Sequence, residues 1–186
     1  MNDFKADIED IRRRARTKLE EGPVTAAYRA DRQKVVDVLN EVLATEIVCT
    51  LRYKNHYFMA QGIHSQAVAN EFLEHANEEQ QHADLVAKRI TELGGNPNFD
   101  PEGMRTRSHA EYKACDTLED MIREDLIAER IAISTYAEIV RWIGNDDPTT
   151  RRMIEGILAT EEEHADDLAK LLVQIGAKPN GNGKRV

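Results

Sequence analysis

The chain has 186 residues, few glycines (10), prolines (5) and aromatic residues (5%), and a high charged fraction of 32%. This length allows one domain with a substantial core, and the composition favours long solvent-facing helices over a sandwich or barrel. No apolar run approaches the ~18 residues that a membrane span needs. We therefore expect a soluble, cytoplasmic protein with no membrane partner.

The formal net charge of −9 is unevenly distributed along the chain. Residues 1–34 hold nine Lys/Arg and seven Asp/Glu, so the remainder carries −11. An acidic body argues against a general nucleic-acid-binding surface and is compatible with attracting cations. The cluster Arg12, Arg13, Arg14 and Arg16 could contact DNA phosphates, but its acidic neighbours favour a solvated amphipathic helix.

The first half of the chain predicts an extension and two long helices. Residues 1–30 form the extension, with a short helix outside the main fold. Residues 31–60 are the first long helix, and residues 65–93 are the second, with Ser65 as its N-cap. Breakers follow each long helix, at Gln61-Gly62 and at Gly94-Gly95-Asn96-Pro97. The apolar stripes alternate steps of four and three, as in a bundle seam.

The second half repeats this plan after a long connection. Residues 94–115 lack clear periodicity and are long for a helix–helix link, which suits a crossover along the bundle. Helices are predicted over residues 116–143 and 148–175, and a flexible polar tail over 177–186. Two helical hairpins joined by one crossover make an all-α, ferritin-like four-helix bundle over residues 31–176.

Each half carries the same acidic pattern. Glu79-x-x-His82 and Glu161-x-x-His164 lie on the stripes of the second and fourth helices. Each is preceded by a lone inward glutamate, Glu46 at 33 residues and Glu129 at 32. One Glu-x-x-His alone is usually chance or a surface pair. Two copies at near-equal spacing, all on apolar faces, indicate a duplicated metal site.

Metal ligation follows from the cost of burial. Four glutamates and two histidines are very costly to bury alone, whereas two divalent cations match the four carboxylate charges and accept neutral imidazoles. Positions i and i+3 share a helix face, so each Glu-x-x-His pair reaches one metal region. Two of the four glutamates bridge the ions, and spacing does not say which. Such ligands suit iron, manganese or surrogate zinc.

The chain resembles the bacterioferritins within the ferritin-like superfamily. The segments that carry the resemblance are Leu39–Ile47, Glu79–Asp84, Glu129 and Glu161–His164, within residues 31–176. It implies a ferroxidase and iron-storage or detoxifying protein with two iron ions per subunit, which oxidises Fe(II) with dioxygen or peroxide. It also implies the catalytic and metal-binding set Glu46, Glu79, His82, Glu129, Glu161 and His164.

The family pattern further implies individual roles. Glu79 and Glu161 would bridge the ions, with Glu46 and His82 on one iron and the remaining pair on the other. Tyr53, seven residues after Glu46, matches a tyrosine near the family's centre; its other interpretation is a core tyrosine. His75 is interpreted as a core or supporting histidine rather than a ligand.

Two departures refine the resemblance. Bacterioferritins have a haem-ligating methionine directly after the second-helix glutamate, where this chain has Gln80, so haem is not expected. Only 10 residues follow Gly176, too few for the fifth helix of 24-subunit cages. With its N-terminal extension, the chain thus resembles Dps-like mini-ferritins, and a homo-oligomeric cage of 12 subunits is favoured over 24.

The remaining polar residues receive plainer interpretations. Glu74, Glu78, Glu162 and Glu163 are expected to be solvated. Cys49 and Cys115 are interpreted as isolated reduced thiols, although Cys49 shares a helix face with Glu46. Alternative functions are a ferritin-fold oxygenase, a peroxide-scavenging enzyme and a non-enzymatic DNA protector. The pattern alone does not determine the oxidant or the native metal.

Overall fold

The computed structural model describes residues 5–60 and 65–176, which are helical throughout their regular structure and contain no strand. This confirms the predicted fold class. No helix within these residues is long and apolar enough to cross a membrane. The helices are α1 (Ile8–Arg14), α2 (Arg32–Met59), α3 (Ser65–Glu92), α4 (Met104–Arg107), α5 (Leu118–Ile143) and α6 (Pro148–Gln174).

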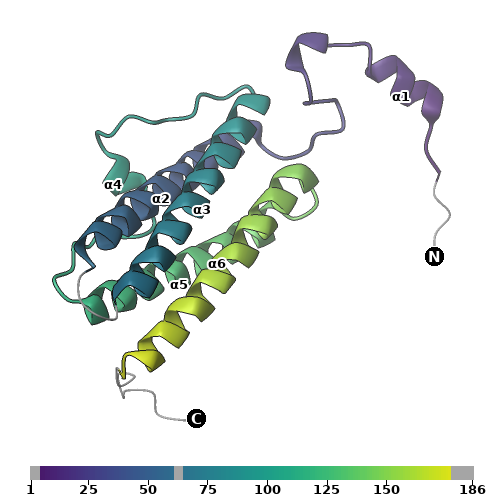
Figure 1. Ribbon diagram of the computed structural model, residues 1–186. Coiled ribbons are helices and arrows are strands. Elements are labelled where there is room, and N and C mark those ends of the chain that lie inside the picture. The colour runs from purple at the N-terminus through teal and green to yellow at the C-terminus, as the bar shows by residue number, and fades with distance from the viewer. Residues whose placement is uncertain (1–4, 61–64, 177–186) are drawn as a thin grey trace.

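The four long helices form two hairpins, α2 with α3 and α5 with α6, which pack side by side (Figure 1). The connection between α3 and α5 runs back along the bundle and carries the short α4, which packs on α2. Sequence periodicity predicted this crossover but not the single turn of α4. The tail at 177–186 and the break at Gln61-Gly62 lie outside the described residues.

The helix ends have local chemical causes. Asp31, Thr117 and Asp147 cap α2, α5 and α6, each accepting a backbone N–H three residues later. These caps satisfy amides that the first helical turn leaves unpaired. Gly94 follows α3 with a φ of +76°, which glycine adopts without a side-chain clash. Ser65 is the first residue of α3, and the residues before it lie outside the described chain.

The core has an apolar cluster toward each end of the bundle. One cluster includes Leu39, Leu43, Val86, Ile139 and Ile157. The other comprises Tyr53, Val68, Phe72, Ala76, Met121, Ile122 and Leu168. On every long helix, the predicted acidic and imidazole residues fall between the two sets. The fold therefore surrounds a polar middle layer with apolar packing.

A buried ionic network fastens the crossover beside this middle layer. Arg52 Nε donates to Asp125 Oδ1 at 2.7 Å, and His56 Nδ1 lies 2.8 Å from Asp125 Oδ2. Arg52 Nη1 also donates to the carbonyl of Glu111 at 2.9 Å, and His56 Nε2 lies 2.9 Å from the carbonyl of Lys113. Because all three charged or imidazole groups are at most 1% exposed, each needs the others as a partner.

The N-terminal extension is attached at the opposite end. Tyr28 donates a 3.0 Å hydrogen bond to Asp147, which also accepts from Arg89 of α3 at 3.1 Å. Helix α1 has no buried residue and lies apart from the bundle (Figure 1). Its Arg13 and Arg14 both pair with Asp10, as expected of a solvated amphipathic helix.

The close contact at Gly95 gives a test of the packing between the crossover and α2. A Cβ at this position would lie 2.6 Å from Val36 Cγ1, and the β-branched Val36 is buried and has little rotamer freedom. We expect Gly95→Ala to destabilise the fold by about 1–3 kcal/mol. Chemical denaturation followed by circular dichroism measures this loss.

Gly156→Ala is the matched control. Gly156 lies inside α6, and a Cβ there meets nothing within 4 Å. Alanine should therefore stabilise the helix by about 0.5–1 kcal/mol. Equal stability changes in the two variants would contradict the packing derived for Gly95.

Candidate metal centre

All six predicted ligands meet in the polar middle layer. Each long helix contributes from its inward face, and each of the six residues is at most 6% exposed. They are Glu46 of α2, Glu79 and His82 of α3, Glu129 of α5, and Glu161 and His164 of α6. Helical spacing places each Glu-x-x-His pair on one face, as the sequence predicted.

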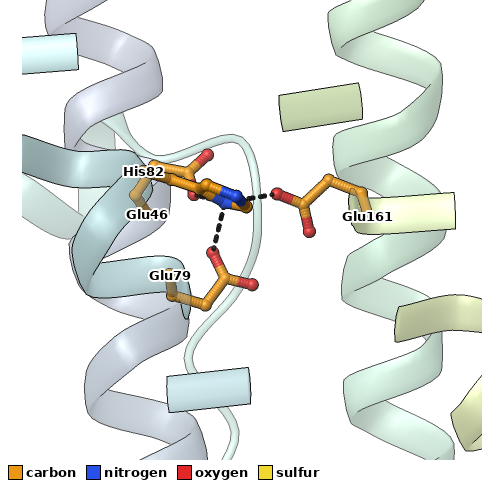
Figure 2. A group of neighbouring side chains, drawn as sticks. All are labelled: Glu46, Glu79, His82 and Glu161. Atoms are coloured by element: carbon orange, nitrogen blue, oxygen red, sulfur yellow. Dashed lines mark hydrogen bonds and ion pairs between the residues drawn. The ribbon is translucent and has the colours of Figure 1, made fainter. Parts of the chain in front are cut away.

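One half of the cluster surrounds His82. Its Nδ1 donates to Glu46 Oε2 at 3.2 Å and lies 3.1 Å from Glu161 Oε1 and 4.0 Å from Glu79 Oε2. Figure 2 shows Glu161 approaching the His82 ring from one side, with Glu46 on the other side and Glu79 below. Both hairpins therefore contribute oxygen atoms to the same small volume.

The other half surrounds His164. Its Nδ1 lies 3.4 Å from Glu161 Oε2, 3.7 Å from Glu79 Oε1 and 4.0 Å from Glu129 Oε2. The two imidazole rings are 6.4 Å apart between centroids. His164 Nδ1, like His82 Nδ1, is therefore surrounded by oxygen atoms of three glutamates.

The potential ligand atoms form two overlapping groups. Glu46, Glu79, His82 and Glu161 each place one such atom within 4.8 Å of the others, and so do Glu79, Glu129, Glu161 and His164. Glu79 and Glu161 belong to both groups. The two carboxylates common to both groups are thus the glutamates of the two Glu-x-x-His motifs.

Several atoms at the centre lack the hydrogen bonds that buried polar groups normally make. Glu79 Oε1, Glu129 Oε2, both Glu161 oxygens and His164 Nδ1 are buried without such a partner. Buried polar groups of this kind need an explanation, and an ion is one. Because these are lone-pair donors directed into one volume, the residues fit divalent cations.

Burial and charge crowding shift the acid–base behaviour of the cluster. Burial and the charges of neighbouring glutamates raise the pKa of Glu79 well above its usual value, and burial and Glu161 do the same for Glu129. Although burial acts in the opposite direction, contacts with Glu161 and Glu46 raise the pKa of His82 to about 10. Without cations, the cluster therefore holds protons that metal binding would displace.

Two tyrosines hold the glutamates outside the common pair. The Tyr53 hydroxyl donates to Glu129 Oε1, and the Tyr136 hydroxyl donates to Glu46 Oε1. Both tyrosines are fully buried. Tyr53 was singled out in the sequence, whereas Tyr136 was not. Each bond leaves the second oxygen of its glutamate available to the centre.

Two further residues support the second histidine. Glu78 was expected to be solvated, but its Oε2 accepts from His164 Nε2 at 2.7 Å, which directs Nδ1 into the cluster. Glu78 is half-exposed, so part of its side chain is solvated, as expected, while its carboxylate bonds to His164. His75 stacks on His164, with ring centroids 4.0 Å apart.

The other residues singled out in the sequence are not members of the ligand groups. Cys49 is a buried free thiol whose Sγ lies 3.8 Å from Arg52 Nη2, and burial raises its pKa. Cys115 is half-buried and also free. Gln80 is exposed and donates to Asp84. None of these side chains is a member of either group.

Comparison with known proteins agrees with the fold. Residues 36–177 match the model of the ferritin-like domain. The chain is 30% identical to a DNA protection during starvation protein of Pyrococcus furiosus, over 83% of this chain and 84% of that one. It is 33% identical to a bacterioferritin of Desulfovibrio desulfuricans, over 75% of each.

A solved structure extends the likeness to three dimensions. The dodecameric thioferritin of Bacteroides fragilis, a bacterioferritin-related protein, superposes with a TM-score of 0.76 at 33% identity. The match covers 80% of this chain and 89% of that protein. On this evidence the chain belongs to the ferritin-like family, with bacterioferritins and Dps proteins as its relatives.

Proposed function

We propose that the protein is a ferroxidase that oxidises Fe(II) to Fe(III) at a dinuclear centre within each subunit and stores the product in a cage. The observation that carries the proposal is the pair of overlapping ligand groups that share Glu79 and Glu161. One carboxylate-rich group would indicate a single cation. Two groups with a common pair of carboxylates favour two adjacent cations.

The ligand roles follow from this overlap. Glu46 and His82 would hold one ion, Glu129 and His164 would hold the other, and the shared Glu79 and Glu161 would contact both. Four ionised carboxylates balance two divalent charges, and the imidazoles ligate as neutral rings. Two Fe(II) substrate ions held here would supply one electron each, which with two protons reduces dioxygen to hydrogen peroxide or hydrogen peroxide to water.

The protein's own groups prepare this chemistry. Loading requires the protons on Glu79, Glu129 and His82 to leave, so metal binding is coupled to proton release. Tyr53 and Tyr136 fix the orientation of the two terminal glutamates before an ion arrives. A positioned ligand set reduces the rearrangement needed on loading.

A cage is the assembly that this function needs, and the surface supports one. Large apolar side chains stay about half exposed or more in the single chain, including Leu51 and Phe58 of α2, Leu85 of α3 and Trp142 of α5. Exposed apolar groups of this size favour contact with other copies. The relative from Bacteroides fragilis is described as dodecameric, so 12 subunits are proposed.

The bridging assignment predicts the result of neutralising the common pair. The double variant Glu79→Gln/Glu161→Gln should lower the first-turnover rate of Fe(II) oxidation more than about 100-fold, because both ions lose a charged ligand. Stopped-flow absorbance measures the rate, and circular dichroism checks that the helices remain. Glu162→Gln/Glu163→Gln removes the same charge from exposed neighbours and should leave the rate near wild type.

A wild-type rate in Glu79→Gln/Glu161→Gln, with folded helices, would reject the proposed centre. A slow rate in the double variant, with wild-type rates in both single variants, would contradict the bridging roles. Single substitutions should each impair the rate, because every bridging ligand contacts both ions.

Glu78 gives a second test, through the orientation of His164. Glu78→Ala should weaken binding of the ion on His164 by about 10–100-fold, as is usual when a histidine ligand loses its carboxylate partner. Glu78→Gln should recover much of the affinity, because its amide oxygen can still accept from Nε2. Calorimetric titration with Zn²⁺ measures both. Equal losses in the two variants would show a charge effect rather than positioning.

The assembly has its own test by native mass measurement. A dodecamer of the 21.1-kDa chain has a mass of about 250 kDa, and a 24-subunit cage has twice that mass. We expect the smaller cage. A stable monomer or dimer would contradict storage and leave the dinuclear centre to an oxygenase or peroxide-scavenging function.

A further inference from the structure

The N-terminal extension has a docked root and an unattached arm. In the root, Val24, Tyr28 and Ala30 pack against the apolar cluster at this end of the bundle. Residues 5–22, called the arm below, include α1 and lead away from the bundle (Figure 1). Helix α1 has seven residues, none of them buried. Because isolated helices shorter than ~12 residues are marginal in water, the arm needs a surface to bind in order to stay helical.

The arm carries an apolar stripe that the single chain leaves open. Ile8, Ile11 and Ala15 follow i, i+3, i+7 spacing and so share one face of the helix. Ile8 is 50% exposed, Ile11 is 44% exposed, and Leu19 farther along is 75% exposed. Apolar side chains grouped in this way on a surface indicate an interaction site.

The arm is also basic beyond its two isoleucines. Residues 12–18 contain five Lys/Arg and no Asp/Glu, whereas the chain after residue 34 carries a net charge of −11. Arg13 and Arg14 pair with Asp10, but these pairs are partly exposed and therefore weak. The arm thus complements an acidic bundle in charge. Since the arm leads away from its own bundle, the acidic surface within its reach is that of another copy.

A groove between α2 and α5 has the matching character. Its volume is about 420 Å³, and Val38, Ile139 and Trp142 form its apolar lining. Glu41 and Glu138 belong to the same lining, and each is more than half exposed. An apolar floor with acidic edges fits a segment in which isoleucines are followed by arginines.

The groove and the root of the arm lie at the same end of the bundle. Trp142 precedes Asp147 by five residues, and Asp147 accepts the hydrogen bond from Tyr28 of the root. Val38 lies in the second turn of α2, which follows the root directly. When two copies meet at this end about a two-fold axis, each arm can therefore enter the groove of the other.

We propose that the arm of one subunit docks in the α2–α5 groove of a neighbouring subunit of the same chain. Ile8 and Ile11 then cover Trp142, and the basic run 12–18 lies beside Glu41 and Glu138. The proposal rests on the proposed cage, which supplies the neighbour. It gives the extension a role in assembly that is separate from iron oxidation.

Photo-cross-linking of the assembled protein tests the contact directly. Benzoylphenylalanine in place of Ile11 is compared with benzoylphenylalanine in place of Glu9, an exposed residue on another side of α1. Both proteins should fold, because α1 has no buried residue. We expect the first to give covalent dimers in which the linked peptide contains Trp142, and the second to lose this product. Native mass is measured on the same samples.

Trp142 is the single tryptophan of the chain, so its fluorescence reports whether the groove is covered. In the Ile8→Asp/Ile11→Asp variant, the emission should shift to longer wavelength and acrylamide should quench it more strongly. Glu9→Gln alters the same helix without removing an apolar group, and its emission should match that of the wild type.

The outcomes separate arm docking from the cage and from the metal centre. Intact cages without the position-11 dimer, or with Trp142 emission unchanged in Ile8→Asp/Ile11→Asp, would overturn the docking and leave both others standing. Cross-links from position 11 only to its own chain, or only to added duplex DNA, would also overturn it. Loss of the cage in Ile8→Asp/Ile11→Asp, together with the position-11 dimer, would support docking as an assembly contact. A wild-type monomer would reject the cage, and the docking with it.

Discussion

Burial of carboxylate charge at the middle of the bundle is the constraint on which the rest of the structure depends. Four glutamates converge there from four helices, and burial raises the pKa of two of them, Glu79 and Glu129. Without cations, the cluster keeps protons on some groups and pairs the rest with imidazoles. Two divalent cations would replace those protons and use lone pairs that now lack partners. We infer that metal binding compensates for the cost of burying these carboxylates.

The surrounding fold keeps that layer in register. Apolar clusters above and below fix the two hairpins against each other, so side chains from α2, α3, α5 and α6 meet at one level. The Arg52–Asp125–His56 network fastens the crossover close to Glu129, which follows Asp125 by one helical turn. Tyr53 and Tyr136 then orient individual carboxylates. Backbone geometry determines the level of each ligand, and hydrogen bonds determine its direction.

Helical periodicity predicted much of this arrangement and left a definable part unpredicted. The four long helices and the inward positions of Glu46 and Glu161 follow from apolar stripes and i, i+3 spacing, which are properties of one helix at a time. Contacts between helices are not. In the sequence, Glu78 resembles any exposed acidic residue. Only the packing of α6 on α3 shows its Oε2 to lie 2.7 Å from His164 Nε2. Arg52 is a charged residue beside a seam, and only its partner on α5 explains its burial.

The central claim is that two cations share Glu79 and Glu161 at the middle of each subunit. Anomalous diffraction at the iron absorption edge, from crystals loaded with Fe(II) without oxygen, tests it most directly. We expect two iron peaks per subunit, one beside His82 and one beside His164, with Glu79 and Glu161 contacting both. A single peak, or two peaks that share neither glutamate, would contradict it.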